Sequence, residues 1–419
     1  MFKKFFPFII LAFVSISLRA QTSKTGVLVI GNTASSVAAS IQSARSGAKT
    51  ILLTQTPAIS ASFTSEDLNF LEKIQKHYLA KIRKKPGTKD STKAFDLNMN
   101  KDQYLKLVKD ISDTTKNLTL TFNTALEKIE KDGKGWEVKL KNGQKIKADV
   151  IVDATENLAI ASILRIDANK TMLSTLATTS PFDTKIYRST LANAYSGTAA
   201  SKTLSLISIG AFLPAGVENF IIVPKGTNTV KPVSMSAGQA AGTIASYCAF
   251  FKTTTKNINV RAVQTELLTF EAQLIPLSDI KESDPNFLAF QRMALSGILK
   301  PVVIKVGDHS AIKFDTTGTI SSEQLRIPVK EFYSRSQIWF ADNKKEVMTI
   351  GDAISLFMFT ATRGEELKKE IEDGWKESFS FDSSFDLKRQ ITRKEFAILA
   401  DRYLQPFNTR IDFAGNLMS

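Results

Sequence analysis

The sequence predicts an α/β protein with a mainly helical C-terminal part, and three observations support this. Residues 26–30 form a continuous apolar run that breaks at Gly31 and passes into an alanine-rich segment typical of a helix. Short strand-like runs follow in the middle of the chain, separated by Asp-Gly and Asn-Gly dipeptides that mark hairpin turns. Beyond Ser278 the apolar residues recur with the spacing of amphipathic helices.

The composition is that of a folded protein with room for two or three domains. The chain has 419 residues, of which 43% are hydrophobic and 23% charged, so neither a disordered nor a fibrous protein is expected. Its single cysteine, Cys248, excludes an intramolecular disulfide, a cysteine-bound zinc site and an iron–sulfur cluster. The two histidines, His77 and His309, lie far apart in sequence, and we expect no metal site.

Residues 1–20 have the pattern of a signal peptide. Lys3 and Lys4 precede an apolar run, Phe5–Ile16, and Ala20 ends the segment. The run is too short to span a bilayer, and no later segment is apolar for long enough to do so. We therefore expect an exported protein, periplasmic or extracellular, without a transmembrane segment in the mature chain.

The chain is basic, and its lysines are spread along its whole length. The formal net charge of +14 falls to +11 once Lys3, Lys4 and Arg19 leave with the signal peptide. The densest run, residues 81–85, precedes Pro86 and is typical of a helix end rather than of a basic stripe with interleaved aromatic residues. We expect no nucleic-acid partner, whereas anionic lipids or acidic polysaccharide would suit such a surface.

The stretch from Thr25 to Thr54 predicts a βαβ unit. A buried strand ends at the turn Gly31-Asn32-Thr33, a helix covers Ala34–Ser46, and a second buried strand follows. This is the order of a dinucleotide-binding unit, in which the glycine turn brings a pyrophosphate to the helix N-terminus. A βαβ unit of some other doubly wound protein is the alternative.

Residues of the dinucleotide-binding fingerprint are replaced in this stretch. The fingerprint has glycine at three positions, for the turn, for the approach of the phosphate and for helix–strand contact, and this chain has Gly31, Thr33 and Ser36 there. The second strand should end in an acid that accepts the ribose hydroxyls, and Thr54 occupies that position. A neutral hydroxyl is a weaker acceptor than a carboxylate, so weak nucleotide binding is expected.

The segment after this unit is predicted to contain a helical insertion and then a β-meander. The insertion covers residues 64–113. The meander is expected from four short runs, at residues 118–122, 125–130, 135–140 and 144–147. It leads into residues 148–155, another doubly buried strand, which ends in Asp153-Ala154-Thr155.

These segments resemble, in order, parts of a broad bacterial family of FAD-dependent oxidoreductases, many of them exported. A meander followed by a strand ending in Asp-Ala-Thr is similar to the part of the flavin-binding domain that leads back to the cofactor. Residues 212–223 resemble the segment before the last flavin strand, and residues 260–273 resemble a later helix. The closest match is Gly238-Gln239-Ala240-Ala241-Gly242, which is similar to the helix start that packs against the flavin.

The resemblance covers residues 26–60 and 117–274 and implies a Rossmann-like FAD-binding domain over residues 21–277. It implies FAD as the cofactor, bound by the residues that match the family's motifs: Gly31, Asn32, Thr33, Ser36, Thr54, Gly238, Gln239, Ala240, Ala241 and Gly242. A tight helix–helix contact is the alternative role for Gly238–Gly242, because small residues let backbones approach closely. Glu156 replaces a family glycine, and no acid–base residue beside a flavin is recognisable, so no catalytic residue is assigned.

Residues 286–419 are predicted as a mainly helical domain. The polar segment 278–285 is expected to separate it from the first domain. A helix is expected over Asn286–Leu299, ending at Gly297. Two later stretches, residues 313–327 and 349–362, are each expected to form a loop followed by a helix.

The last predicted helix begins with a capping box, with Thr392 as N-cap and Glu395 three residues later. This start resembles the S-layer homology repeat, a helix–loop–helix module that binds cell-wall polymers in other proteins. Residues 320–325 resemble a degenerate second copy. The resemblance implies contact with a cell-envelope polymer, and a plain helical domain docked on the core is the alternative.

Two functions of different classes follow from these features. The retained fold motifs favour an exported FAD-dependent oxidoreductase-like protein that acts on a small molecule or carbohydrate. The replaced cofactor contacts favour a non-catalytic envelope or polysaccharide-binding protein that keeps the flavoprotein fold with an eroded cofactor site. Likeness of fold alone does not decide between them.

The signal peptide predicts that the mature protein begins near Gln21. Expression in a host with an export pathway should yield material whose intact mass lacks about the first 20 residues. Exported material that retains Met1 would contradict this prediction.

Overall fold

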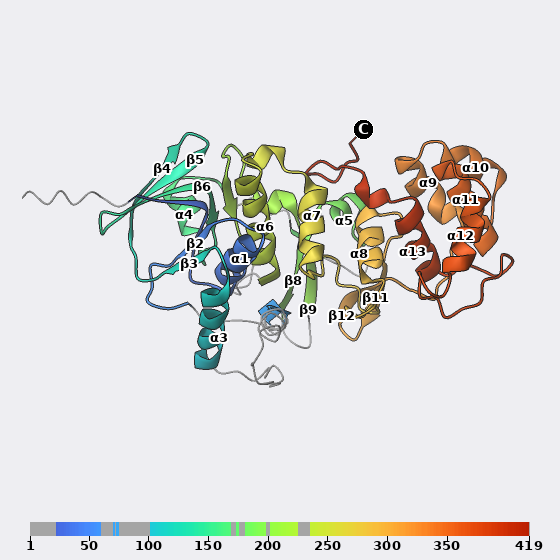
Figure 1. Ribbon diagram of the computed structural model, residues 1–419, viewed down its shortest axis with the longest axis horizontal. Coiled ribbons are helices and arrows are strands. Elements are labelled where there is room, and N and C mark those ends of the chain that lie inside the picture. The colour runs from blue at the N-terminus through green and yellow to red at the C-terminus, as the bar shows by residue number, and fades with distance from the viewer. Residues whose placement is uncertain are drawn as a thin grey trace, which may run out of the picture.

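The computed structural model describes residues 22–59, 70–71, 73–74, 101–168, 173–175, 181–197, 202–224 and 235–418. The predicted signal peptide and most of the predicted insertion lie outside these residues. The molecule is elongated, with a large sheet at one end and a cluster of helices at the other (Figure 1). None of the helices within the described ranges is long and apolar enough to cross a membrane.

The large sheet is mixed parallel and antiparallel. Its seven described strands lie in the order β3 (Leu118–Thr121), β2 (Thr50–Leu53), β1 (Thr22–Ile30), β6 (Lys145–Asp153), β5 (Gly135–Leu140) and β4 (Leu126–Asp132), with β10 (Phe220–Ile222) also on β6. The strands β3, β2, β1, β6 and β10 run parallel, whereas β4, β5 and β6 form an antiparallel meander. The predicted α/β fold class is confirmed.

The meander differs in detail from the predicted one. Its two tight turns carry Gly133 and Gly143 at φ +60° and +84°, as the Asp-Gly and Asn-Gly dipeptides predict. The run at residues 118–122, however, forms β3 and pairs in parallel with β2. The runs at residues 144–147 and 148–155 belong to one strand, β6, whose first half pairs with β5 and whose second half pairs with β10.

The second half of strand β1 is buried on both faces, and its alternate side chains enter two different cores. Val27 and Val29 belong to the core on the helical side of the sheet. Leu28 and Ile30 belong to the core beneath the meander, together with Trp136 and Val138 of β5. The continuous apolar run at residues 26–30 therefore reflects burial from both sides, by the helices on one face and by residues of the meander on the other.

The helical layer consists of α1 (Ala34–Arg45) and α6 (Met235–Phe250), which pack on each other without large side chains between them. A Cβ atom on Gly238 would lie 2.2 Å from the carbonyl oxygen of Ser35, and one on Gly242 would lie 2.3 Å from the carbonyl oxygen of Ala39. Those distances are too short for real Cβ contacts, so both positions require glycine. Next to Gly238, Gln239 Nε2 donates to Gln42 Oε1 at 3.0 Å.

The middle of the molecule contains a second sheet and several helices. The second sheet has the order β7 (Leu173–Thr175), β9 (Lys202–Ser208) and β8 (Thr190–Gly197), all antiparallel. Two connections of the large sheet contain helices: α3 (Lys101–Thr114) precedes β3, and α4 (Ala159–Ile163) follows β6. The middle region contains α5 (Thr184–Ser189) and α7 (Val260–Thr269). The helix α7 confirms the helix expected at residues 260–273.

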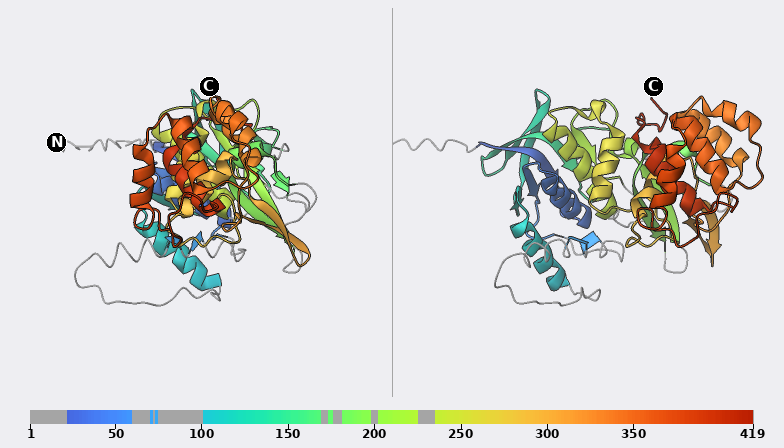
Figure 2. Two further views of the ribbon diagram at one scale, coloured as in Figure 1. Left: turned by 90° about the vertical axis from the view of Figure 1, so that its right-hand side faces the viewer. Right: turned by 45° about the vertical axis from the view of Figure 1, so that its right-hand side comes forward.

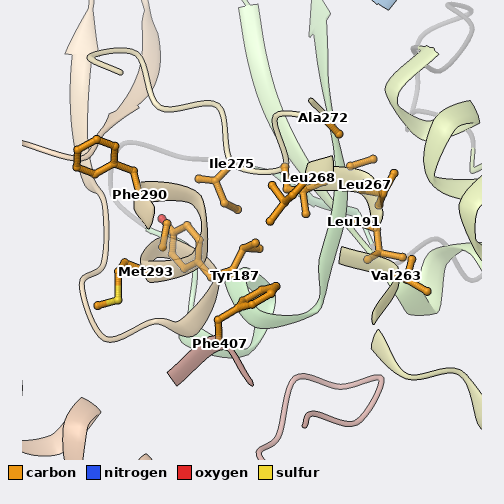
Figure 3. Packing of buried hydrophobic residues seen from close by; sticks show 14 of the residues in the cluster. Tyr187, Leu191, Val263, Leu267, Leu268, Ala272, Ile275, Phe290, Met293 and Phe407 are labelled. Carbon is orange, nitrogen blue, oxygen red and sulfur yellow. The ribbon is translucent and has the colours of Figure 1, made fainter. Parts of the chain in front are cut away.

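The helix α8 (Phe287–Ser296) joins the middle of the molecule to the C-terminal helices. It ends at Gly297, which has φ +77°, as predicted. Phe290 and Met293 of α8 pack with Tyr187 of α5 and with Phe407, near the C-terminus (Figure 3). The hydrophobic core therefore continues from the first domain into the C-terminal helices.

Polar contacts reinforce this junction. Arg261 of α7 donates through Nε to the carbonyl oxygen of Thr409 at 3.3 Å and lies over the ring of Phe407 at 4.6 Å. Burial, together with the nearby charge of Arg188, lowers the pKa of Arg261. Arg188 of α5 forms an ion pair with Glu331 of the C-terminal helices. The predicted boundary at residues 278–285 stays a prediction.

The C-terminal helices are α9 (Ser322–Phe332), α10 (Ser336–Asp342), α11 (Ile350–Ala361), α12 (Glu366–Gly374) and α13 (Arg393–Tyr403). A hairpin of β11 (Val302–Val306) and β12 (His309–Lys313) precedes them. The expected helices after residues 313 and 349 are thus present as α9 and α11. Figure 2 shows these helices gathered at the end opposite the large sheet.

Three of these helices begin in the same way. Capping boxes join Ser321 to Gln324 in α9, Thr349 to Asp352 in α11 and Thr392 to Glu395 in α13. The three chain segments that lead into the boxes bond to one another: Met348 N donates to Ile320 O, Ile391 N to Met348 O, and Arg393 N to Gly318 O. The three helix starts therefore form a closed triangle. The sequence indicates two such helix starts, at residues 320–325 and at Thr392, and the structure adds a third at Thr349.

The contact between α1 and α6 predicts that Gly242→Ala destabilises the fold. The added methyl group would overlap the backbone at Ala39, which costs about 1–3 kcal/mol of unfolding free energy. Denaturant unfolding measures this change.

Gly307→Asn is the matched control, because Gly307 has φ +59° and no atom within 4 Å of an added Cβ. Asparagine tolerates the left-handed conformation, so a change within about 0.5 kcal/mol is expected. Equal losses in the two variants would show that the helix contact is not the cause.

Candidate functional site

The turn after β1 lies at the carboxyl edge of the parallel strands, where α/β proteins bind ligands. Gly31 has φ +154°, and a Cβ atom there would lie 2.7 Å from the carbonyl carbon of Ala154, just beyond the end of β6. The chain therefore crosses the neighbouring strand too closely for any side chain. Glycine is retained at this fingerprint position because the backbone path requires it.

The side chains at the other two fingerprint positions are bonded within the chain. Thr33 is the N-cap of α1: its Oγ1 accepts from Ser36 N at 3.1 Å and donates to the carbonyl oxygen of Ala154 at 3.0 Å. Ser36 is fully buried, and its Oγ donates to Thr33 O at 2.7 Å. The amide of Ser36, which an anion at the helix N-terminus would use, already has a partner.

Thr54 directly follows β2 and is 1% exposed. Its Oγ1 lies 2.7 Å from Oγ1 of Thr56, and Thr56 N donates to Thr54 Oγ1 at 3.1 Å. Asn32 of the glycine turn donates through Nδ2 to Thr56 Oγ1 at 3.3 Å. The structure thus brings Asn32 and Thr54 together through Thr56, which the sequence interpretation did not single out.

The strand β6 ends in a buried carboxylate whose role is structural. Asp153 accepts from Thr155 Oγ1 at 2.6 Å and from Ala161 N at 2.8 Å, and so fixes the start of α4. Burial raises the pKa of Asp153, and these hydrogen bonds act in the opposite direction. Glu156, which the sequence places near the expected phosphate, is exposed. In the sequence, an acidic residue at the end of an otherwise apolar strand is the feature that could have identified Asp153 as a buried structural carboxylate.

The five residues Gly238–Gly242 lie on the first turns of α6, against the first turns of α1. Gly238 meets Ser35 and Gly242 meets Ala39, so the glycines serve the helix–helix contact that the sequence left as the alternative. Ala240 and Ala241 are fully buried. A direct contact of this segment with a flavin stays a prediction.

The electrostatics of the turn suit an anion, although weakly. The first turn of α1 contains no acidic residue, so the positive end of the helix dipole is not offset by its own side chains. No buried side-chain nitrogen or oxygen of Asn32, Thr33, Ser36 or Thr54 lacks a hydrogen-bond partner in the described structure. The turn can present backbone amides to a pyrophosphate, but its polar side chains already have hydrogen-bond partners within the chain.

The C-terminal helices carry two further clefts. One, of about 940 Å³, lies between α9 and α10 and is lined by Arg326, Lys330, Lys344 and Lys345 among others. The other, of about 660 Å³, is lined by Arg335, Met358, Phe359 and Lys368 among others. Arg393 lies in neither, because it is buried and donates to the carbonyl oxygens of Phe314 and Lys300.

Comparison with known families gives one match. Residues 26–166 match the model of the FAD dependent oxidoreductase family. This range contains the βαβ unit, the meander and the end of β6, and it stops before α6. No curated protein matches the chain.

Solved structures show a distant similarity. A variant of PqsL from P. aeruginosa is 12% identical over 65% of this chain and 96% of its own, with a TM-score of 0.34. Bacillithiol disulfide reductase from Staphylococcus aureus is 12% identical over 32% of this chain and 38% of its own, with a TM-score of 0.23. Thioredoxin reductase from T. acidophilum is 14% identical over 32% and 35%, with a TM-score of 0.21.

The last two structures are matched over little more than a third of their own length. At these identities and TM-scores the structural similarities support no inference about chemistry. The family match, which rests on the sequence of the βαβ unit and meander, supports FAD as the cofactor and an oxidoreductase-like function.

The N-cap of α1 predicts that Thr33→Ala loses about 1 kcal/mol of unfolding free energy, because Ser36 N and Ala154 O each lose a partner. Thr33→Ser keeps the hydroxyl and should stay close to the native value. Denaturant unfolding compares the two. Equal destabilisation by serine and alanine would assign the effect to the lost methyl group instead of the cap.

Proposed function

We propose that this chain is an exported FAD-dependent oxidoreductase-like protein that acts on a small molecule or a carbohydrate. The observation that carries the proposal is the turn at Gly31, which delivers the N-terminus of α1 to the carboxyl edge of the parallel sheet. An oxidoreductase of this kind holds the cofactor's pyrophosphate at that helix end. The family match over residues 26–166 supports the same assignment.

FAD would supply the chemistry, by accepting or donating a hydride at its ring system. The chain's own contribution would be binding and orientation. The pyrophosphate would lie over Gly31–Ser36, the adenosine ribose would meet Thr54, and the flavin end would approach Gly238–Gly242. Weak affinity is expected, because Thr54 replaces a charged acceptor and Ser36 N is already bonded to Thr33.

The second candidate function is a non-catalytic envelope or polysaccharide-binding protein that keeps the flavoprotein fold. The bonds that join Asn32, Thr54 and Thr56 favour it, because they satisfy within the chain the side chains that a cofactor would otherwise use. The family match does not separate the two functions, because a protein can keep a fold after losing the catalytic activity associated with it.

The C-terminal helices would supply contact with an envelope polymer in either case. Three helices with matching capping boxes, and basic clefts at the C-terminal helices, are features that suit a repeat-built binding surface. Arginine and lysine side chains at these clefts would favour an anionic polymer. The inward position of Arg393 leaves that residue out of such a contact.

The deciding prediction is the flavin content of the purified protein. A lost charge-assisted pair costs on the order of 1.5–3 kcal/mol, and 3 kcal/mol is roughly a hundredfold in affinity, so a site of this kind should purify partly empty and fill on addition of FAD. Visible absorbance and an FAD titration measure this. Thr54→Glu with Ser36→Gly should tighten binding by up to about a hundredfold.

Thr54→Gln with Ser36→Gly is the matched control, because it has similar length at Thr54 without the charge. Bound flavin in the native protein supports the enzyme. Flavin only in the Glu-containing variant identifies an eroded site and supports the binding protein. The absence of flavin from every form would refute the cofactor assignment.

A further inference from the structure

The amino edge of the large sheet, opposite the cofactor edge, carries a second cleft of about 730 Å³. Five segments form it: the start of β1, the turn between α1 and β2, the hairpin of β4 and β5, the middle of β6, and the end of α6. Lys24 at this edge and Ile30 at the other are six residues apart on β1, which corresponds to about 20 Å. The cleft is therefore separate from the candidate cofactor site.

The cleft is basic. It is lined by Lys24, Lys49, Lys134, Lys147 and Lys252 but by only two acids. Those acids are already paired, because Lys147 bonds Asp132 at 2.7 Å and Lys252 bonds Asp149 at 2.8 Å. Within the described part of the chain, Lys24, Lys49 and Lys134 have no carboxylate at ion-pair distance. The cleft therefore has an excess of three positive charges.

Two phenylalanines project beside these lysines. Phe250 is 64% exposed and Phe251 is 61% exposed at the end of α6, with their ring centroids 5.2 Å apart. Phe250 lines the cleft, and its ring lies 4.0 Å from the position of a Cβ on Gly47. Two large aromatic side chains exposed side by side form an apolar patch, and such patches mark surfaces that contact a partner or a membrane.

We propose that this edge, formed by Lys24, Lys49, Lys134, Phe250 and Phe251, docks onto an anionic lipid surface. The lysines complement acidic head groups, and the two phenyl rings can enter the boundary between head groups and acyl chains. A soluble polyanion would use the lysines but would leave both rings in water. The combination of charge and exposed rings therefore favours a bilayer as the occupant.

The connection to the rest of the chain agrees with this orientation. Strand β1 begins at Thr22, two residues before Lys24, so the described chain enters the fold at this same edge. With this edge on a bilayer, the C-terminal helices would lie at the end of the molecule away from the membrane (Figure 1).

Vesicle sedimentation tests the proposal. The chain from Gln21, which contains every described element, is mixed at low salt with vesicles of phosphatidylcholine alone or of phosphatidylcholine and phosphatidylglycerol in equal parts. Binding is expected to the anionic vesicles only, and added salt should weaken it. Beginning at Gln21 removes the apolar run, so any binding comes from the folded protein.

Two patch variants locate the binding surface. Replacing Lys24, Lys49 and Lys134 together by glutamine should weaken vesicle binding by about a hundredfold, at roughly fivefold per lysine. Phe250→Ser with Phe251→Ser should weaken it by at least about tenfold without changing the salt dependence. Neither variant should alter FAD titration, because the patch lies at the opposite edge of the sheet.

Matched controls come from the C-terminal helices and hairpin. Ile327→Ser with Ile338→Ser removes two side chains that are 58% and 55% exposed, and replacing Lys305, Lys376 and Lys388 by glutamine removes the same charge as the patch variant. Both controls should bind vesicles like the native chain. Thermal unfolding checks that every variant is folded.

Three outcomes would overturn the proposal. In the first, the native chain does not bind anionic vesicles. In the second, the control variants lose as much vesicle binding as the patch variants, which would show that the attraction depends on overall charge. In the third, heparin and anionic vesicles each bind the phenylalanine variant as tightly as the native chain, which would make the edge a general site for polyanions that does not use the rings.

Discussion

The close contact between α1 and α6 is the constraint on which the rest of the fold depends. Gly238 and Gly242 bring one helix onto the backbone of the other at Ser35 and Ala39. This contact joins the first βαβ unit to a helix some 200 residues later in the chain and covers one face of the parallel sheet. Strand β1 can be apolar on both faces only because this helical layer and the meander cover it from opposite sides.

That contact also changes what the sequence resemblance means. The segment from Gly238 to Gly242 is the most specific match to the flavoprotein family, yet its glycines are required by helix packing whether or not a flavin is present. The same is true of Gly31, which the path over Ala154 requires. Residues that the fold needs are retained, so the resemblance reports the fold more reliably than it reports the cofactor.

The features that could be predicted are those encoded by neighbours in sequence. The apolar run of β1, the hairpin glycines and the end of α8 at Gly297 each depend on local backbone chemistry. The partner of β3, the second sheet and the bonds through Thr56 depend on residues that meet only in the folded chain. The capping box at Thr349 escaped detection because Asp352 stands where the common pattern has glutamate or glutamine.

The distribution of retained and replaced residues bears on function. Glycines that serve the close backbone contacts, Gly31, Gly238 and Gly242, are retained. By contrast, Thr33 and Thr54, which stand where a cofactor would require an open backbone and a charge, have side chains bonded to their own chain. An empty site kept for a tight ligand would be expected to leave buried donors or acceptors without partners, since those groups are placed for the ligand. The described turn leaves no such side chain. Any flavin bound here must therefore be held mainly by backbone amides and the helix dipole, whose contributions are smaller than that of a carboxylate on the ribose.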